Sequence, residues 1–182
     1  MKIFYAVDIQ RDFMNEDGAL YVPGAEDIKS NIHDLCSYAR AGSISLWASL
    51  DWHEEDDVEF KTFPKHCVKN TDGAQLIGEV AFHNPGPLFF KTTYDVFAEP
   101  YIERALEYYK VDEAIVFGVA ADICVQAAVL GLLKKGIKCY VVEDAIKGVF
   151  PDKTETAIKG MKEAGAVFIT TKQILKGELD GL

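Results

Sequence analysis

Short runs of apolar residues alternate with longer stretches of helical periodicity along the chain. The apolar runs predict strands over residues 3–7, 43–50, 88–90, 113–119, 138–142 and 166–169. Between them, apolar positions three or four residues apart predict helices over residues 25–41, 100–110, 122–135 and 153–164. The strand runs are continuously apolar, so we expect both faces of the sheet to be covered. Alternating strands and helices predict a mostly parallel sheet of about six strands in a three-layer α/β/α sandwich.

The pattern contains no break that would mark a second domain. No internal repeat, low-complexity segment or linker interrupts it, so we expect residues 1–182 to form a single domain. The stretch 51–73 is irregular and long for a loop. Long loops in compact domains are often functional, and this one is therefore a candidate for part of a site.

The net charge and the hydropathy of the chain exclude some classes of binding partner. The net charge of -10 argues against nucleic acid or an anionic membrane as a partner, because either needs a basic face. No stretch reaches the roughly 20 apolar residues of a membrane span, and the N-terminus is typical of a first strand rather than a signal peptide. We therefore expect a cytoplasmic protein that acts on a small molecule. The oligomeric state stays open, with a homo-oligomer as one alternative.

Reactive side chains follow several of the predicted strands. In an open parallel sheet, ligands bind beyond the carboxyl ends of the strands. The side chains expected at those ends include carboxylates, an ammonium group and a thiol: Asp8, Asp51, Lys91, the segment 119–124 with Cys124, and then Glu143 and Asp144. The sequence therefore predicts that these groups converge on one edge of the sheet.

The four cysteines differ in the environment that the pattern predicts for them. They are too sparse for a disulfide scaffold and form no CxxC pair. Cys124 lies two residues after Asp122, a predicted helix N-cap, and the partial positive charge of a helix start favours the thiolate. From position alone, a buried and unreactive thiol is the alternative. Cys36 and Cys139 fit that alternative, whereas Cys67 follows His66 in the long loop and could be either.

Five short segments, in matching order and spacing, resemble the isochorismatase-like cysteine hydrolase superfamily. They are AVDIQRDF at 6–13, DWH at 51–53, FPKHC at 63–67, FFKTTYDVF at 89–97 and GVAADICV at 118–125. Within the superfamily, the second and third look like the metal loop of the nicotinamidase/pyrazinamidase branch. The resemblance covers nearly the whole chain. It implies a cysteine amidohydrolase, and the reaction that it favours most is the hydrolysis of nicotinamide to nicotinate and ammonia.

The resemblance also implies catalytic roles that the side-chain chemistry supports. Cys124 would attack the amide carbon and form a thioester. Asp8 would take the thiol proton and pass it to the departing ammonia, while Lys91 would favour the thiolate and keep Asp8 charged. The backbone N–H groups of Ala120 and Cys124 would hold the oxyanion, next to a Val119–Ala120 peptide bond that is cis in the family.

Histidines and acids of the long loop form a candidate metal site. Asp51 and His53 are two residues apart at a strand end, so both side chains can turn to one side, and His66 joins them from the loop. This ligand set suits Zn, Fe or Mn, and the resemblance implies that the metal takes the pyridine nitrogen of the substrate. Relatives with a glutamate at this position favour Glu59 as the fourth ligand. The other acids of the loop are expected to be solvated: Glu54, Glu55, Asp56 and Asp57.

The substrate ring needs apolar walls. The resemblance assigns Phe13, Phe63 and Tyr94 to the pocket, with ordinary core packing as the alternative for each. His33 and His83 are expected at the surface. Two other functions remain open at this point. One is a carbamoyl-amide, ureido-amide or vinyl-ether hydrolase of the superfamily, whose members commonly lack the metal loop. The other is a noncatalytic binding protein on the same fold.

Overall fold

Six parallel strands form one sheet in the computed structural model, which describes residues 1–178. The strand order is β3-β2-β1-β4-β5-β6, and every neighbouring pair is parallel. The strands are β1 (Lys2–Val7), β2 (Ser45–Asp51), β3 (Leu88–Lys91), β4 (Glu113–Val119), β5 (Lys138–Lys147) and β6 (Val167–Ile169). The predicted parallel sheet of about six strands is thus confirmed.

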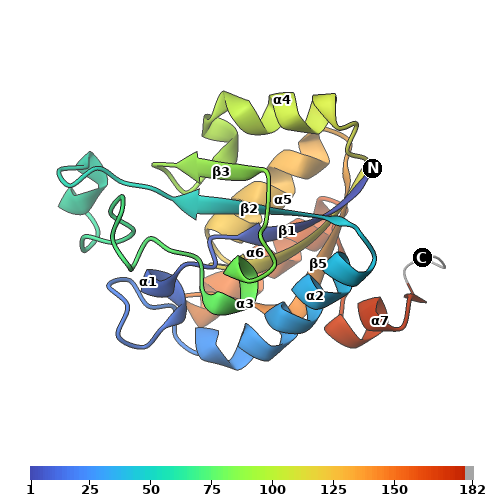
Figure 1. Ribbon diagram of the computed structural model, residues 1–182, viewed down its shortest axis with the longest axis horizontal. Coiled ribbons are helices and arrows are strands. Elements are labelled where there is room, and N and C mark those ends of the chain that lie inside the picture. The colour runs from blue at the N-terminus through green and yellow to red at the C-terminus, as the bar shows by residue number, and fades with distance from the viewer. Residues whose placement is uncertain (179–182) are drawn as a thin grey trace.

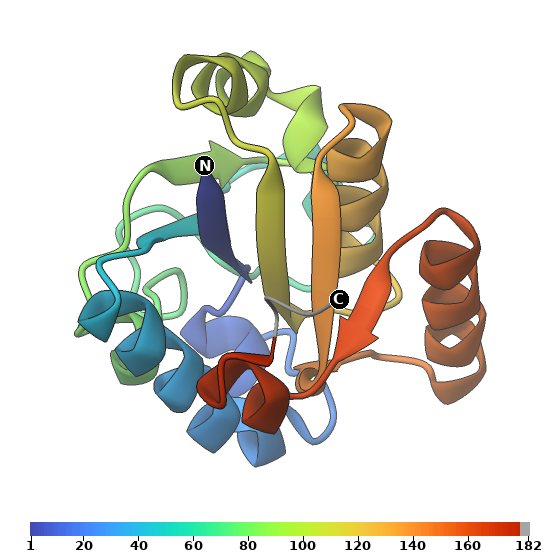
Figure 2. The ribbon, with the colours of Figure 1, turned by 90° about the vertical axis from the view of Figure 1, so that its right-hand side faces the viewer.

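Helices cover both faces of the sheet. The α-helices are α1 (Arg11–Met14), α2 (Lys29–Ala41), α3 (Gly78–Ala81), α4 (Pro100–Tyr108), α5 (Cys124–Lys134), α6 (Pro151–Glu163) and α7 (Thr171–Leu175), and the 3₁₀ turns are η1 (Ala25–Ile28), η2 (Val58–Lys61) and η3 (Val96–Ala98). Helices α2, α3 and α7 lie on one side of the sheet and α4, α5 and α6 on the other, as predicted for a three-layer sandwich (Figures 1 and 2). Within residues 1–178, no helix combines the length and apolar character needed to cross a membrane.

Strand side chains alternate between two hydrophobic cores. Phe4 and Ala6 of β1 point into the core under α2, while Ile3, Tyr5 and Val7 point into the core under α5. All five are at most 1% exposed. Because both faces are buried, the strands are apolar throughout, as the sequence pattern indicated.

The fifth strand is longer than the sequence predicts. β5 continues to Lys147, with an irregular register against β4, so Glu143 and Asp144 lie inside the strand. The Asp144 carboxylate accepts hydrogen bonds of 2.8 Å from both the N–H and the hydroxyl of Thr171, at the start of α7. The expectation that Glu143 and Asp144 stand at the carboxyl edge of the sheet is therefore wrong.

The direction of the strand order reverses at β1. The chain adds β2 and β3 on one side of β1, and β4 then follows on the other side. Gly118 pairs with Val7 across this point, and a Cβ at Gly118 would lie 2.1 Å from the Val7 carbonyl oxygen. This close approach brings Asp8, directly after β1, next to the segment 119–124 that follows β4. Parallel sheets bind ligands at such a reversal, beyond the carboxyl ends.

Candidate active site

The three residues predicted as a catalytic triad lie together at the strand reversal. The Lys91 ammonium is 2.8 Å from Asp8 Oδ2 and 3.8 Å from Cys124 Sγ. All three side chains are buried. They come from the ends of β1 and β3 and from the first residue of α5, so only the folded sheet assembles them.

Lys91 is a fully buried lysine between two carboxylates. Its ammonium contacts Asp8 on one side and Asp51, the last residue of β2, on the other. Burial alone would lower the pKa of Lys91, but the two carboxylates raise it well above the usual value. Lys91 therefore stays charged and compensates the negative charge of both acids.

Ser49 orients the Asp8 carboxylate. The Ser49 hydroxyl donates a 2.7 Å hydrogen bond to Asp8 Oδ1, and the Asp8 backbone N–H donates to the Ser49 carbonyl. Burial raises the pKa of Asp8, against the lowering effect of Lys91. The raised pKa makes Asp8 a better proton acceptor than an ordinary aspartate. Ser49 was not predicted as a site residue, although a serine two residues before Asp51 in an apolar strand is a signal that could have identified it.

Cys124 is a buried thiol at the start of a helix, in a different electrostatic state from the one predicted. Burial raises the pKa of Cys124 well above its usual value, even though Lys91 acts to lower it, and the Asp8 carboxylate is within hydrogen-bonding reach. The expected lowering of the thiol pKa is therefore wrong, because burial, the largest effect, outweighs the lowering by Lys91. The resting group is a thiol beside a base.

Asp122 was predicted to cap the helix that carries Cys124, but its side chain bonds elsewhere. Helix α5 begins at Cys124, after Ile123, and has no side-chain cap at that end. The Asp122 carboxylate instead accepts hydrogen bonds of 2.9 and 3.1 Å from the N–H groups of Val149 and Phe150. Asp122 thus ties the 119–124 segment to the end of β5 and does not cap α5.

The segment between β4 and α5 has the backbone shape that the resemblance implied. The Val119–Ala120 peptide bond is cis. The Ala120 carbonyl accepts hydrogen bonds from the N–H groups of Ile123 and Val125, at 3.0 Å each. Ala120 and Cys124 both line the same cavity, and the N–H of a first helical residue has no partner within its helix. These two N–H groups remain the predicted oxyanion donors.

Asp51, His53 and His66 form a compact group that fits a divalent metal. Asp51 Oδ2 lies 3.9 Å from His53 Nε2 and 3.7 Å from His66 Nε2. Ligand atoms about 2.1 Å from one ion stand at most about 4.2 Å apart, so these distances suit a shared ion. His53 Nε2 is also buried and has no hydrogen-bond partner within residues 1–178. A metal ion would satisfy it.

The second ring nitrogen of each histidine has its own acceptor. His66 Nδ1 lies 2.8 Å from the Pro64 carbonyl oxygen, and His53 Nδ1 lies 3.1 Å from Asp57 Oδ2. A hydrogen on Nδ1 leaves the Nε2 lone pair free for a ligand bond. The Asp57 side chain is only 12% exposed, so the expectation that this acid is solvated is wrong.

Three other acids of the loop are exposed, as predicted, and a fourth, Glu59, lies near the metal group. Glu54 and Glu55 are exposed and pair with lysines of the same loop, and Asp56 is exposed as well. Glu59 Oε2 lies 3.9 Å from His53 Nε2. Burial, and next the Asp51 carboxylate, raise the pKa of Glu59. Glu59 borders the compact group without belonging to it, and its role as fourth ligand remains a prediction.

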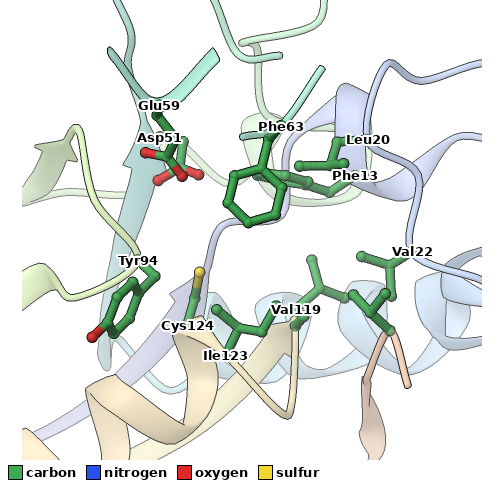
Figure 3. Close-up of a pocket in the computed structure, with 12 residues that line it drawn as sticks. Phe13, Leu20, Val22, Asp51, Glu59, Phe63, Tyr94, Val119, Ile123 and Cys124 are labelled. Carbon is green, nitrogen blue, oxygen red and sulfur yellow. The ribbon is translucent and has the colours of Figure 1, made fainter. Parts of the chain in front are cut away.

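A small apolar cavity opens beside the thiol. Its volume is about 90 Å³, and its walls are formed by Phe13, Leu20, Val22, Asp51, Glu59, Phe63, Tyr94, Val119, Ala120, Ile123, Cys124 and Val149. Figure 3 shows the Cys124 sulfur pointing toward the Phe63 ring and toward the carboxylates of Asp51 and Glu59. The three predicted aromatic residues all line the cavity. Phe13 is buried, whereas Phe63 is 41% and Tyr94 59% exposed at the rim.

The wall opposite the carboxylates was missed by the sequence analysis. Leu20 and Val22 belong to a segment without regular periodicity, which folds back over α1. The Leu20 N–H donates to the Asp12 carbonyl, and the Val22 N–H donates to the Phe13 carbonyl. These contacts close the cavity on that side, and nothing in the apolar pattern indicates them.

The other cysteines and histidines lie outside this cavity. Cys36 and Cys139 are buried, and burial raises the pKa of each to about 12, as expected for unreactive thiols. Cys67 is buried too, and its pKa is raised still further. His33 is exposed as predicted, but its neighbour His83 is only half-exposed, with buried ring nitrogens.

Comparison with known proteins agrees with this geometry. The isochorismatase domain family matches residues 3–173. A nicotinamidase of Escherichia coli is 30% identical over 199 residues, which cover 90% of this chain and 92% of the relative. A pyrazinamidase of Pyrococcus horikoshii, solved in complex with zinc, is 30% identical with a TM-score of 0.87, covering 93% of this chain and 98% of that one. A protein of L. infantum in complex with nicotinate is 25% identical with a TM-score of 0.86, covering 94% and 93%. The chain belongs to the isochorismatase family.

Proposed function

We propose that the chain is a nicotinamidase, which hydrolyses nicotinamide to nicotinate and ammonia through a thioester on Cys124. One observation carries the proposal. Cys124 and Asp51 line one small apolar cavity. Behind them, Lys91 joins the thiol to Asp8, and His53 and His66 join Asp51 in the histidine–carboxylate group. The named activities of the E. coli relative and the nicotinate bound to the L. infantum protein support the same substrate.

The cavity suits a flat heteroaromatic amide. Its apolar walls would hold the ring between Phe13 and Phe63, with the carboxamide next to the Cys124 thiol. A divalent ion bound by Asp51, His53, His66 and Glu59 would supply a coordination position for the pyridine nitrogen. Zn, Fe and Mn are the candidate ions, and the P. horikoshii relative, solved in complex with zinc, supports the binding of a metal. Fixing the ring at both ends orients the amide carbon for attack, which lowers the entropic part of the barrier.

Proton transfer through Asp8 would drive the first half of the reaction. Asp8 takes the Cys124 proton as the sulfur attacks the amide carbon, and the N–H groups of Ala120 and Cys124 hold the oxyanion. Asp8 then protonates the leaving amine, ammonia departs, and the acyl group stays on sulfur. Lys91 keeps the Asp8 carboxylate charged before each transfer.

Water would complete the second half. Asp8, unprotonated again, removes a proton from a water molecule that attacks the thioester carbonyl. The C–S bond breaks, Asp8 returns the proton to the Cys124 sulfur, and the product acid gives its own proton to solvent and leaves as nicotinate. The metal-free reactions of other superfamily members fit the site less well, because they leave the buried His53 Nε2 without a partner.

Ammonia release tests the proposal directly. The purified protein is incubated with nicotinamide and a zinc, iron or manganese salt, and both ammonia and nicotinate are measured. We expect equal amounts of the two products from the native chain. The Cys124→Ala variant should release neither, whereas Cys139→Ala should retain activity. Absence of ammonia with every ion, from protein with a native unfolding transition, would overturn the proposal.

A further inference from the structure

We propose that Asp57 is a positioning residue for metal binding, which orients both His53 and Glu59 through the two oxygens of one carboxylate. The inference rests on the metal site proposed above. Asp57 Oδ2 lies 3.1 Å from His53 Nδ1, and Asp57 Oδ1 accepts a 2.9 Å hydrogen bond from the Glu59 N–H. The side chain is 12% exposed, in contrast to the exposed Glu54, Glu55 and Asp56 that precede it.

The contact with His53 selects the tautomer that can bind a metal. A neutral imidazole carries one hydrogen, on either Nδ1 or Nε2. Because the Asp57 carboxylate can only accept, it holds that hydrogen on Nδ1 and leaves the Nε2 lone pair bare. His53 Nε2 is the buried atom that faces Asp51 and Glu59, at 3.9 Å from an oxygen of each. A carboxylate acceptor also raises the basicity of the ligating nitrogen.

The contact with Glu59 fixes the turn that carries this acid. Asp57 immediately precedes the 3₁₀ turn η2, and its side chain caps the turn by accepting from the Glu59 N–H. The turn also places the Phe60 ring 5.3 Å from the His53 ring and 5.7 Å from the His66 ring. Asp57 therefore sets the position of two proposed ligands at once.

An amide cannot replace this carboxylate, although its shape is the same. Asn at position 57 has one oxygen and one NH₂ group, whereas the site requires two acceptors. If the oxygen caps η2, the NH₂ group faces His53 Nδ1 and favours the tautomer with hydrogen on Nε2. If the oxygen accepts from His53, the Glu59 N–H loses its cap. We therefore expect Asp57→Asn to weaken metal binding by about 10- to 100-fold, the usual range for a lost outer-shell carboxylate.

The matched control is Asp56→Asn, which changes the charge equally at an exposed neighbour. Metal-free full-length protein is titrated with Zn²⁺ against a chelator that has a visible absorbance, and the zinc dissociation constants of native chain and variants are compared. Asp56→Asn should match the native chain, and Asp57→Asn should bind more weakly. The visible spectrum of the Co²⁺ form should change in Asp57→Asn alone. Equal zinc affinity in the two variants would overturn the role of Asp57.

Two further results separate this inference from the proposed site and from folding. If the native chain binds zinc and Asp57→Asn binds it equally well, the metal site stands and only the inference falls. If the native chain binds no zinc, both fall. ¹⁵N spectra of the metal-free native chain, recorded at a pH where the His53 ring is neutral, report the His53 tautomer without any substitution. We expect hydrogen on Nδ1, and hydrogen on Nε2 would contradict the proposal even if Asp57→Asn did not fold.

Discussion

Lys91 joins the thiol part of the site to the carboxylate–histidine part. Its ammonium touches Asp8, Asp51 and the Cys124 sulfur, and it is 1% exposed. Without it, Asp8 would be a buried carboxylate with no compensating charge, and Asp51 would keep only its neighbours in the metal group, His53 and His66. Lys91 therefore contributes to the stability of the fold as well as to the proposed chemistry.

Replacement of Lys91 should reveal both contributions. We expect Lys91→Ala to lose most of its nicotinamide hydrolysis and to be destabilised by about 3–5 kcal/mol, the usual cost of leaving a buried charge unpaired. Urea unfolding followed by circular dichroism measures the loss of stability. Lys135→Ala removes an exposed ion pair with Glu103 and should change the free energy of unfolding by less than about 1 kcal/mol. Equal losses in the two variants would show that Lys91 is not a buried counter-charge.

The proton-transfer role of Asp8 leads to a second expectation. Asp8→Asn keeps the shape of the side chain and can still accept from Ser49, but it cannot take the Cys124 proton. General base catalysis contributes about 10²- to 10⁴-fold, so kcat should fall within that range. Steady-state ammonia release gives the value, with the exposed Asp17→Asn as the unchanged control. A loss of only a few-fold would remove Asp8 from the role of base.

Single residues differ in how far the sequence could predict them. Asp8 and Lys91 were predictable because one follows a strand and the other ends one, and Cys124 because it begins the helix that follows β4 at the same edge. Ser49 stands out in the sequence as a polar residue in an apolar strand, but the roles of Ser49 and Asp57 were not predictable, because they depend on which atoms the two side chains meet after folding. The Ser49 hydroxyl meets Asp8, 41 positions away in the sequence. The direction of the Cys124 pKa was also out of reach, since burial sets it.

Elements were predicted best where periodicity is long and apolar. β4 was predicted with its observed bounds, and α2, α4 and α6 were found within a few residues. Short elements that pack through few apolar residues were missed, including α1, α3 and α7. β5 was predicted too short because its second half is polar, and only its pairing with β4 extends it. Because the strand was predicted to end at residue 142, Glu143 and Asp144 were wrongly placed at the carboxyl edge of the sheet.

The segment between β2 and β3 is the element on which the proposed metal site depends. Its 3₁₀ turn η2 presents Glu59 toward His53, whereas Glu55 points to solvent and pairs with Lys65. We expect Glu59→Gln to retain less metal after dialysis and to raise KM more than Glu55→Gln does. Elemental analysis of both dialysed variants measures the difference. Unchanged occupancy in Glu59→Gln would leave the metal with Asp51, His53 and His66 as its protein ligands.

At the scale of the whole molecule, the topology determines where the chemistry can occur. The strand order reverses at β1, so the ends of β1 and β4 meet, and the ends of β2 and β3 lie beside them. The thiol comes from one side of the reversal and the metal group from the other. The parallel sheet was predictable from alternation, and with it the edge that carries the site. The small size of the cavity was not, because Leu20 and Val22, which form one of its walls, belong to a segment without regular periodicity.

The cavity as a whole should therefore discriminate between amides by their ring nitrogen. Benzamide has the same ring size as nicotinamide and fits the same apolar walls, but it offers no lone pair to an ion held by Asp51, His53 and His66. A site built to bind one polar atom can reject an analogue that lacks it by a large factor. We expect kcat/KM for nicotinamide to exceed that for benzamide in the metal-loaded protein, and the preference to shrink in Glu59→Gln, which weakens the metal site. Ammonia release from both amides, at equal protein and metal concentrations, measures the ratio. Equal rates would mean that the ring nitrogen meets no metal, and would favour a metal-independent hydrolase of the same family.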